Sequence, residues 1–283
     1  MILPSRFWAE LSSRDFVALQ ACGEASRTIA ILPVASTEQH GPHLPLNVDT
    51  VLVNGVIAAA LPHLAADLKT LFLPTLAVGL SVEHQQFPGT LTLKNETILR
   101  LWTDLSECVA ASGIQKLVLF NAHGGNVSVM DMVARDLRAR CNMLVYGVSW
   151  FNLPLTDTQG KDIHAMFSAD EHRFGIHAGN IETSMMLALD PRHVDMAHAQ
   201  NFHSTAEDRS RQFEILGNGT SAKLGWQMQD YNLAGAVGNA AAATADNGHA
   251  VVEAAGHALA KLLGEIDHLP TDTHGLLIST TSS

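Results

Sequence analysis

The chain has 283 residues, of which 47% are hydrophobic and 16% are charged, and its formal net charge at pH 7 is −11. A chain of this length buries roughly 75% of the surface that its unfolded state exposes, which excludes wholesale disorder. The acidic balance argues against nucleic acid or an anionic membrane as the main partner, and it suits a protein that binds divalent cations. The low charged fraction predicts a homo-oligomer in which subunit contacts cover part of the surface.

The three cysteines, Cys22, Cys108 and Cys141, are scattered along the chain and lack CxxC spacing. This pattern predicts reduced, buried thiols in a cytoplasmic protein, and neither a disulfide framework nor a zinc knuckle. Residues 1–16 carry charged side chains without a continuous apolar segment, so we expect no signal peptide. No apolar run reaches the ~18 residues that cross a bilayer, so we expect no membrane-spanning helix.

Short β-branched segments alternate with longer segments of helical periodicity along the chain. The predicted strands cover residues 28–34, 71–75, 116–120 and 143–149, and the predicted helices cover residues 49–61, 95–111, 127–140, 181–189 and 240–263. Asp49 or Thr50 is expected to cap the first of these helices. The alternation predicts an α/β fold, a single-domain three-layer sandwich with a mainly parallel sheet flanked by helices.

The sequence contains no internal repeat, linker or sign of a second domain. We therefore expect residues 1–266 to form one domain and residues 267–283 to form a loosely ordered C-terminal tail. Residues 200–235 are polar and irregular, and we expect a loop region there at an active site or an interface. In a parallel α/β sheet the ligand crevice lies beyond the carboxyl ends of the strands, so a site is expected at that edge.

Acidic residues and histidines gather at the predicted strand ends. The residues concerned are Glu38, His40, His43 and Asp49 after the first strand, His123 after the strand at 116–120, and His177 and Glu182 around the start of the helix at 181–189. Each has a structural alternative, because a lone histidine is more often a core residue, Asp49 suits a helix cap and Glu182 suits the positive end of a helix dipole. Their joint placement favours a set of ligands for Zn²⁺, Mn²⁺ or Fe²⁺.

Several motifs in the sequence are similar to those of a known family. The segment LPVASTEQHGPHLPLNVD at 32–49 resembles the opening motif of the creatininase (creatinine amidohydrolase) family. Similar segments follow in the family's order: SVEH with FPGT at 81–90, NAHGGN at 121–126, HAGNIETS at 177–184, and GAVG with ATADNG at 235–248. The resemblance extends from about residue 7 to residue 264, and it implies the creatininase-like fold and a homo-oligomer, typically a hexamer.

The resemblance also implies a dinuclear metal-dependent hydrolase that acts on amide C–N bonds with two divalent transition-metal ions per chain, Zn, Mn or Fe. Matched position by position, Glu38, Asp49 and His123 would hold one ion. His40, the shared Asp49 and Glu182 would hold the other.

Four further residues follow from the same comparison. His177 matches the family histidine that faces the reacting centre, and it is the candidate general acid or base. Ser81 lies near a position that contacts substrate, with His84 close by. His43 belongs to the opening motif without an implied role, and we expect it to order the loop around the ligands.

Two departures from the family pattern bear on the substrate. Creatininases carry Tyr and a metal-ligating Glu directly after the residue that matches His123, where this chain has Gly124 and Gly125. Glu182 is therefore expected to supply the missing carboxylate. The aromatic and acidic residues that grip creatinine are replaced by Arg173, Phe174 and Gly175, so creatinine is not the expected substrate.

The expected reaction is hydrolysis of a C–N bond other than a peptide bond, in a small amide, lactam or formamide, by a metal-bridging hydroxide. A covalent serine mechanism is disfavoured because the chain has no Gly-x-Ser-x-Gly motif. Two alternatives stay open: a peptidase-like or cofactor-maturing hydrolase of the same family, and a non-catalytic, metal-stabilised oligomeric module.

Overall fold

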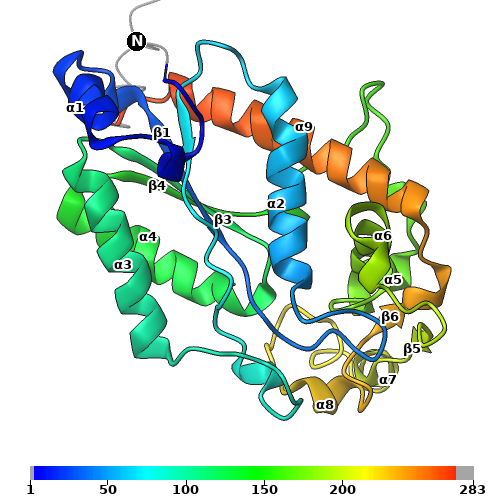
Figure 1. The fold of residues 1–283 in the computed structure, drawn as a ribbon. Helices are drawn as coiled ribbons and strands as arrows, with labels where there is room; N and C mark the ends of the chain where they lie inside the picture. Colours follow the sequence, from blue (N-terminus) through cyan, green and yellow to red (C-terminus); the bar gives the residue numbers. More distant parts are fainter. Residues whose placement is uncertain (1–2, 272–283) are drawn as a thin grey trace, which may run out of the picture.

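A four-stranded parallel sheet with the order β2-β1-β3-β4 organises the chain, as seen in a computed structural model that describes residues 3–271 (Figure 1). The strands are β1 (Ile29–Val34), β2 (Thr70–Phe72), β3 (Lys116–Asn121) and β4 (Leu144–Ser149). Val34 pairs with Asn121 and Asn121 pairs with Ser149, so three strands end at the same level. The segments that follow these strands therefore begin side by side.

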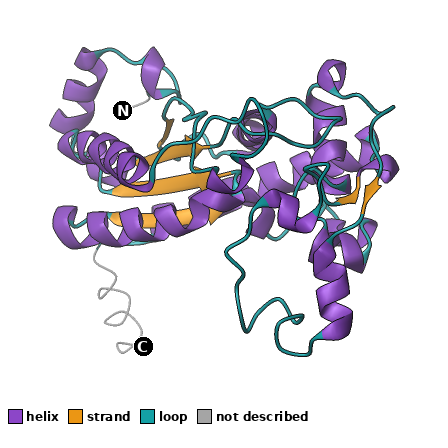
Figure 2. Cartoon of the chain, turned by 90° about the horizontal axis from the view of Figure 1, so that it is seen from below, coloured by secondary structure: helices purple, strands orange, loops and turns teal. Residues whose placement is uncertain are grey.

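Helices cover both faces of the sheet. They are α1 (Ser13–Ala21), α2 (Val48–Ala60), α3 (Asn95–Ala111), α4 (Val127–Cys141), α5 (Ala169–Phe174), α6 (Asn180–Leu189), α7 (Thr205–Gln212), α8 (Met228–Tyr231) and α9 (Ala245–His268). Figures 1 and 2 show α3 and α4 on one face of the strands and α2 and α9 on the other. A short antiparallel pair, β5 (Asn201–Phe202) and β6 (Gly238–Asn239), lies apart from the main sheet.

The alternating side chains of β1 build two separate hydrophobic cores. Ile29 and Ile31 pack with residues of α2 and α9, whereas Ala30 and Leu32 pack with residues of α3 and α4. All six residues of β1 are buried, as expected for a strand inside a parallel sheet with both faces covered. The predicted three-layer α/β architecture is confirmed.

The close approach of α9 to α2 depends on a small residue. A Cβ added to Gly256 of α9 would lie 2.6 Å from the Cβ of Ala59 in α2. With no side chain on α9 at this point, the two helices cover the sheet at a short interhelical distance. This packing holds α2, whose first turn carries Asp49, against the rest of the domain.

The structure corrects several details of the prediction. The last helix begins at Ala245 and not at 240, because the Thr244 side chain accepts a hydrogen bond from the Asn247 N–H and caps it. Asp49 lies within the first turn of α2, after the cap residue Asn47, so it is not the helix cap. The expected irregular region 200–235 contains α7 and α8, whose short polar sequences have little apolar periodicity.

The prediction of buried thiols is wrong. Cys22 and Cys108 are exposed and Cys141 is partly exposed, and all three are free thiols. They lie at the ends or on the outer sides of α1, α3 and α4. Of the predicted tail at 267–283, the first two residues complete α9 and residues 272–283 lie outside the described part. Within residues 3–271 no helix is long and apolar enough to cross a membrane.

Candidate metal centre

Acidic and histidine side chains from four parts of the fold meet beyond the carboxyl end of the sheet, and all of them are buried except Glu182, which is half-buried. Glu38 and His40 follow β1, Asp49 comes from the first turn of α2, His123 follows β3, and His177 and Glu182 come from the turn before α6 and its first turn. All of these residues are predicted from the sequence, and the structure brings them together. The level ends of β1 and β3 place their following loops next to each other.

Three sets of candidate ligand atoms lie within 4.8 Å of one another. The sets are Glu38, Asp49 and His123; His40, Asp49 and Glu182; and Glu38, His40 and His177. In the first set, His123 Nδ1 lies 3.2 Å from Glu38 Oε1 and 3.4 Å from Asp49 Oδ2. In the second, His40 Nε2 lies 3.5 Å from Asp49 Oδ1. The first two sets match the ligand groups inferred from sequence, and they share Asp49.

Backbone carbonyls fix which nitrogen of each histidine faces the carboxylates. His40 Nδ1 donates to the Glu38 carbonyl at 3.0 Å, and His123 Nε2 donates to the carbonyl of Leu80 at 2.9 Å. His177 Nε2 donates to the carbonyl of Gln39 at 2.8 Å. The remaining ring nitrogens are therefore unprotonated in the neutral rings and point towards the acidic residues. Metal-ligating histidines are commonly oriented in this way.

Several buried polar atoms at this site have no hydrogen-bond partner among the described residues. They are both carboxylate oxygens of Glu38, Nε2 of His40 and Oδ2 of Asp49. Buried polar groups are almost always satisfied, so unpaired atoms that converge on one point call for a ligand that accepts several lone pairs. A divalent cation is such a ligand, and the donor set of carboxylates and imidazoles suits Zn²⁺, Mn²⁺ or Fe²⁺.

Without a cation, the acids and histidines compensate each other's charge. Burial disfavours a charged His123, but the carboxylates of Glu38 and Asp49 outweigh it and raise its pKa to about 10. Burial also opposes the charged form of His40, and Asp49 overcomes this and raises its pKa to about 9. Burial raises the pKa of Glu182 to about 7. The cluster thus attracts positive charge strongly.

His177 is enclosed by two other imidazole rings. Its ring centroid lies 4.2 Å from that of His40 and 4.3 Å from that of His84. Burial and the neighbouring histidines hold the pKa of His177 well below its usual value, so the ring is neutral. Its unprotonated Nδ1 lies 3.8 Å from Glu38 Oε1. A neutral imidazole here can accept a proton or bind a cation.

Glu182 has a structural contact as well as its place near the ligands. Its Oε2 accepts a hydrogen bond of 2.5 Å from the backbone N–H of Ala178, which leaves Oε1 available. Ala178 is one of only two non-glycine residues with positive φ in the described chain, at 54°. The carboxylate therefore holds the strained turn that presents His177.

The weaker predictions, Ser81 and His84, fall within the same cluster. Ser81 is buried, and its hydroxyl lies within hydrogen-bond distance of Ser36 and 3.3 Å from His123 Nε2. His84 Nδ1 lies 2.8 Å from the Gln39 amide nitrogen, and its Nε2 lies 3.4 Å from Glu38 Oε1. Their contact with substrate stays a prediction.

His43 connects the opening motif to α6. Its Nε2 lies 2.9 Å from the hydroxyl of Thr183, and its ring stacks on Phe202 at 5.5 Å. Burial lowers the pKa of His43 to about 4, so the ring is neutral at pH 7. These contacts support the expected role of ordering the loop.

Three residues of the site were not predicted from the sequence. The Gln39 side chain donates to Gly235 O at 2.8 Å and so links the loop after β1 to a distant segment. Glu83 is a buried acid whose Oε1 lies 3.5 Å from His123 Nε2. Trp226, from the expected loop region, lies edge-on to His84 at 6.2 Å. The resembling segments contained Gln39 and Glu83, but only the folded chain shows their contacts.

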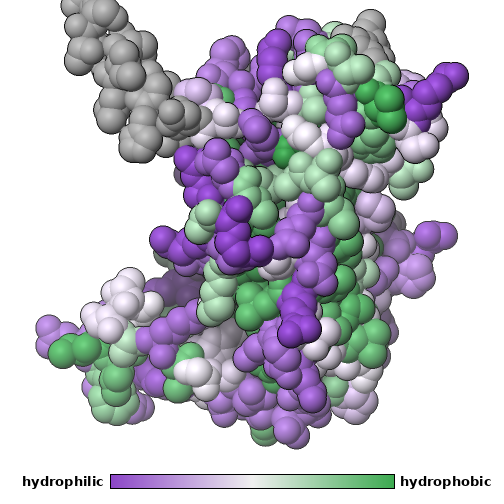
Figure 3. Space-filling view, turned by 90° about the vertical axis from the view of Figure 1, so that its left-hand side faces the viewer, coloured by the Kyte–Doolittle hydropathy of each residue, from purple (hydrophilic) through white to green (hydrophobic). Residues whose placement is uncertain are grey.

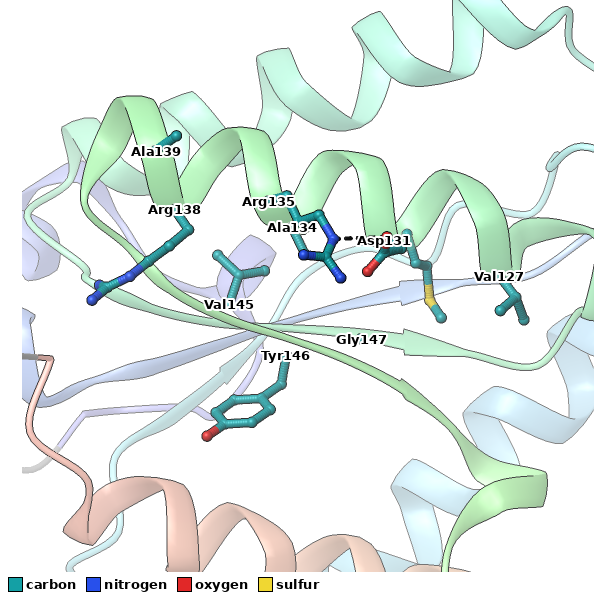
Figure 4. A pocket seen from close by; sticks show the side chains of 10 residues that line it. Val127, Asp131, Ala134, Arg135, Arg138, Ala139, Val145, Tyr146 and Gly147 are labelled. Atoms are coloured by element: carbon teal, nitrogen blue, oxygen red, sulfur yellow. Dashed lines mark hydrogen bonds and ion pairs between the residues drawn. The ribbon is translucent and has the colours of Figure 1, made fainter. Parts of the chain in front are cut away.

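A groove of about 670 Å³ lies elsewhere, between α4 and the edge strand β4. Figure 4 shows its lining side chains, with Arg135 paired to Asp131 at 2.8 Å on α4 and Tyr146 on β4. None of the predicted site residues lines this groove. It is therefore separate from the metal-ligand cluster.

Comparisons with known proteins agree with the motifs. Residues 9–263 match the creatininase family, described as creatinine amidohydrolase, and the chain therefore belongs to this family. It is 35% identical over 170 residues to the mycofactocin precursor peptide peptidase of Mycobacterium tuberculosis (strain ATCC 25618 / H37Rv), a match covering 58% of this chain. It is 30% identical over 207 residues to the creatinine amidohydrolase of Pseudomonas putida. This match covers 68% of this chain and 75% of that protein.

Solved structures show the same architecture. A creatininase variant superposes with a TM-score of 0.72 at 26% identity, covering 93% of this chain and all of that one. The chain spans only 59% of the length of the mycobacterial peptidase that it matches. The predicted family is confirmed.

Proposed function

We propose that the protein is a metal-dependent hydrolase of amide-type C–N bonds that holds two divalent transition-metal ions, Zn, Mn or Fe. The observation that carries this proposal is the pair of ligand sets that share Asp49 and contain unpaired, buried donor atoms. Glu38, Asp49 and His123 would hold one ion, and His40, Asp49 and Glu182 the other. Family membership supports the same chemistry.

Two cations bound at these residues would supply an activated water at neutral pH and polarise the substrate carbonyl. His177 is placed to move the proton, because its ring is neutral and its unprotonated Nδ1 faces the ligand cluster. The bond from Nε2 to the Gln39 carbonyl keeps the ring in this orientation. Protonation of the leaving nitrogen matters because an amine anion departs too slowly unaided.

Two substrate classes fit this site: a small amide, lactam or formamide, and a peptide. The identity of 35% to a peptidase favours the peptide, together with the loss of the residues that grip creatinine at 173–175. A non-catalytic module is disfavoured, since a chain without activity need not keep every ligand and a neutral, enclosed His177.

We also propose that the protein forms a homo-oligomer. Five large hydrophobic side chains in a stretch of about twenty residues around α8 are between 48% and 85% exposed: Phe213, Ile215, Leu216, Leu224 and Leu233. Figure 3 shows hydrophobic side chains at the surface of one face, including a lobe that projects from the body. Exposed apolar side chains grouped in this way are typical of subunit contacts.

The test is an assay of the protein reconstituted with Zn²⁺, Mn²⁺ or Fe²⁺ against a panel of peptides, small amides, lactams and formamides. We expect metal-dependent release of an amine that a chelator abolishes and added metal restores. Bound metal with no turnover of any member of the panel would favour the non-catalytic module.

A further inference from the structure

Glu171, which lies outside the ligand cluster, is a buried carboxylate in α5. It is 4% exposed, and it makes no salt bridge within residues 3–271. Its hydrogen-bond partners are backbone amides: Asn180 N–H donates to Oε1 at 2.6 Å, and Asn239 N–H donates to Oε2 at 2.9 Å. Because both oxygens accept hydrogen bonds from N–H groups, the side chain is held as an acceptor on both sides.

Three glycines enclose this carboxylate, two from the stretch directly after α5 and one from β6. A Cβ on Gly175 would lie 2.5 Å from Glu171 Cδ, and one on Gly238 would lie 2.8 Å from Oε2. A Cβ on Gly179 would collide with Oε1. The end of α5, the start of α6 and strand β6 therefore approach one side chain more closely than any other residue type would allow.

The segments that Glu171 joins lie on both sides of His177. Asn180, which binds Oε1, follows the turn formed by His177, Ala178 and Gly179. Asn239, which binds Oε2, lies two residues after Val237, whose N–H donates to the His177 carbonyl at 2.9 Å. The backbone of His177 is thus fixed between two attachments to the same carboxylate.

This turn needs such support because it contains strain. Ala178 has a φ of 54°, which costs free energy for a residue with a Cβ and persists only where the surroundings impose it. Glu182 holds one side of the turn through the Ala178 N–H. Glu171 holds the chain beyond it. Burying an unpaired carboxylate is costly, and backbone amides are the partners that offset this cost here.

We propose that Glu171 is a positioning residue that holds the turn carrying His177 in its active conformation, without touching the ligand cluster itself. The role assigned to His177 rests on the proposed hydrolase function. The geometric part of the proposal, that Glu171 orders residues 176–182, does not depend on it.

The test compares Glu171→Gln with Glu265→Gln, which changes an exposed glutamate of α9. The amide introduced by Glu171→Gln would turn an NH2 group towards one of the two backbone donors, while it keeps nearly the same volume. We measure metal content, kcat and KM on the metal-loaded enzyme, and peptide-level hydrogen exchange on the metal-depleted protein. We expect faster exchange in residues 176–182 and 237–239, unchanged exchange elsewhere, and a kcat reduced by about tenfold or more, with KM nearly constant.

Gly175→Ala gives a second disturbance that keeps the carboxylate, since its φ is not in the left-handed region and its Cβ would push on Glu171. Gly264→Ala is its control, because nothing lies within 4 Å of that added Cβ. Gly175→Ala decides the question if Glu171→Gln does not fold.

The proposal is overturned if the folded variants keep wild-type exchange at 176–182, or if they lose protection throughout the chain. Wild-type kcat in a variant whose turn has loosened would overturn the link to His177. Absence of activity in the wild type would refute the hydrolase function. The hydrogen exchange of residues 176–182 would still decide whether Glu171 orders the turn.

Discussion

The Glu182 carboxylate accepts a hydrogen bond of 2.5 Å from the N–H of Ala178, four residues earlier in the chain. The contact ties the first turn of α6 to the strained residue that follows His177. The same carboxylate belongs to a candidate ligand set with His40 and Asp49. The two interpretations of Glu182, helix-terminal acid and metal ligand, are therefore compatible, because each needs only one oxygen.

Glu182→Gln separates these roles. The amide oxygen of Gln can still accept from Ala178, so we expect the loss of structural stability to stay within about 1 kcal/mol. The second ion would keep only two protein ligands, so we expect loss of one metal per chain and nearly all turnover. Metal analysis and the amide assay measure both effects. Full metal content with normal activity would show that Glu182 only supports the helix and the turn.

Asp49→Ala tests the shared ligand. Asp49 is buried and belongs to both sets of the proposed dinuclear site, so its removal should abolish binding of both ions. Metal analysis of the wild type, purified without chelator, should give close to two transition ions per chain. The control is Asp131→Ala, a surface residue on α4 whose metal content should match the wild type. Retention of both ions by Asp49→Ala would contradict the bridging role.

Gly125→Ala and Gly124→Ala form a matched pair next to His123. A Cβ at 125 would collide with Leu80 O, Glu83 Oε1 and His123 Nε2, whereas nothing lies within 4 Å of a Cβ at 124. We expect Gly125→Ala to displace His123, weaken binding of the first ion and lower the thermal stability. Gly124→Ala should change neither quantity. Equal behaviour of the two variants in metal titrations and thermal unfolding would show that the packing around Glu83 is not critical.

The collision at Gly125 also explains a departure from the family pattern. The family resemblance implies a carboxylate at this position, and here the carboxylate of Glu83 fills the adjoining space. The Gly-Gly pair predicts that Glu182 supplies the missing carboxylate, and this stays a prediction. It could not predict Glu83, because that contact depends on a loop about forty residues earlier in the chain.

Local signals were sufficient for the four strands of the parallel sheet and for the proposed ligand residues that follow them. Continuous β-branched and apolar runs identify β1 and β3, and the direction of a parallel sheet then brings Glu38 and His123 together. The cradle of Glu171 had no local signal, since Gly238 and the amide of Asn239 come from a segment 68 residues away that only tertiary structure brings next to Glu171. The two helices within residues 200–235 were missed for a related reason. These short polar helices are stabilised by side-chain caps, as at Ser204, and α7 buries no stripe of apolar residues that a periodicity would reveal.

The proposed oligomer makes a further prediction. Light scattering at micromolar concentration should give a multiple of the 30.4 kDa chain mass. Ile215→Asp with Leu216→Asp should reduce that mass, because charged side chains disfavour burial of the exposed cluster. Val17→Asp is the control, since Val17 is 63% exposed on α1, away from this cluster in the sequence. A wild-type monomer of 30.4 kDa would refute the proposal.

His43 gives a prediction about pH. Burial lowers its pKa from the ordinary value of 6.5 to about 4, because protonation would place a charge among Thr183, Phe202 and the core of the loop. Between these two pH values the unfolded chain binds a proton that the folded chain does not. The stability that His43 contributes is therefore fully present above pH 6.5 and is lost as the pH falls towards 4.

Urea unfolding of the metal-depleted protein at pH 7, 5.5 and 4.5 measures this effect against a His43→Gln variant. One titrating group changes the free energy of unfolding by at most ~1.4 kcal/mol per pH unit. The free energy of unfolding of the wild type should therefore fall by up to that amount per pH unit relative to the variant. His43→Gln should be less stable at pH 7, because it loses the stacking on Phe202. The difference between the two proteins should shrink as the medium becomes acidic. A difference that is constant from pH 7 to 4.5 would mean that His43 titrates normally in the folded protein, and that its burial does not hold the opening loop against α6.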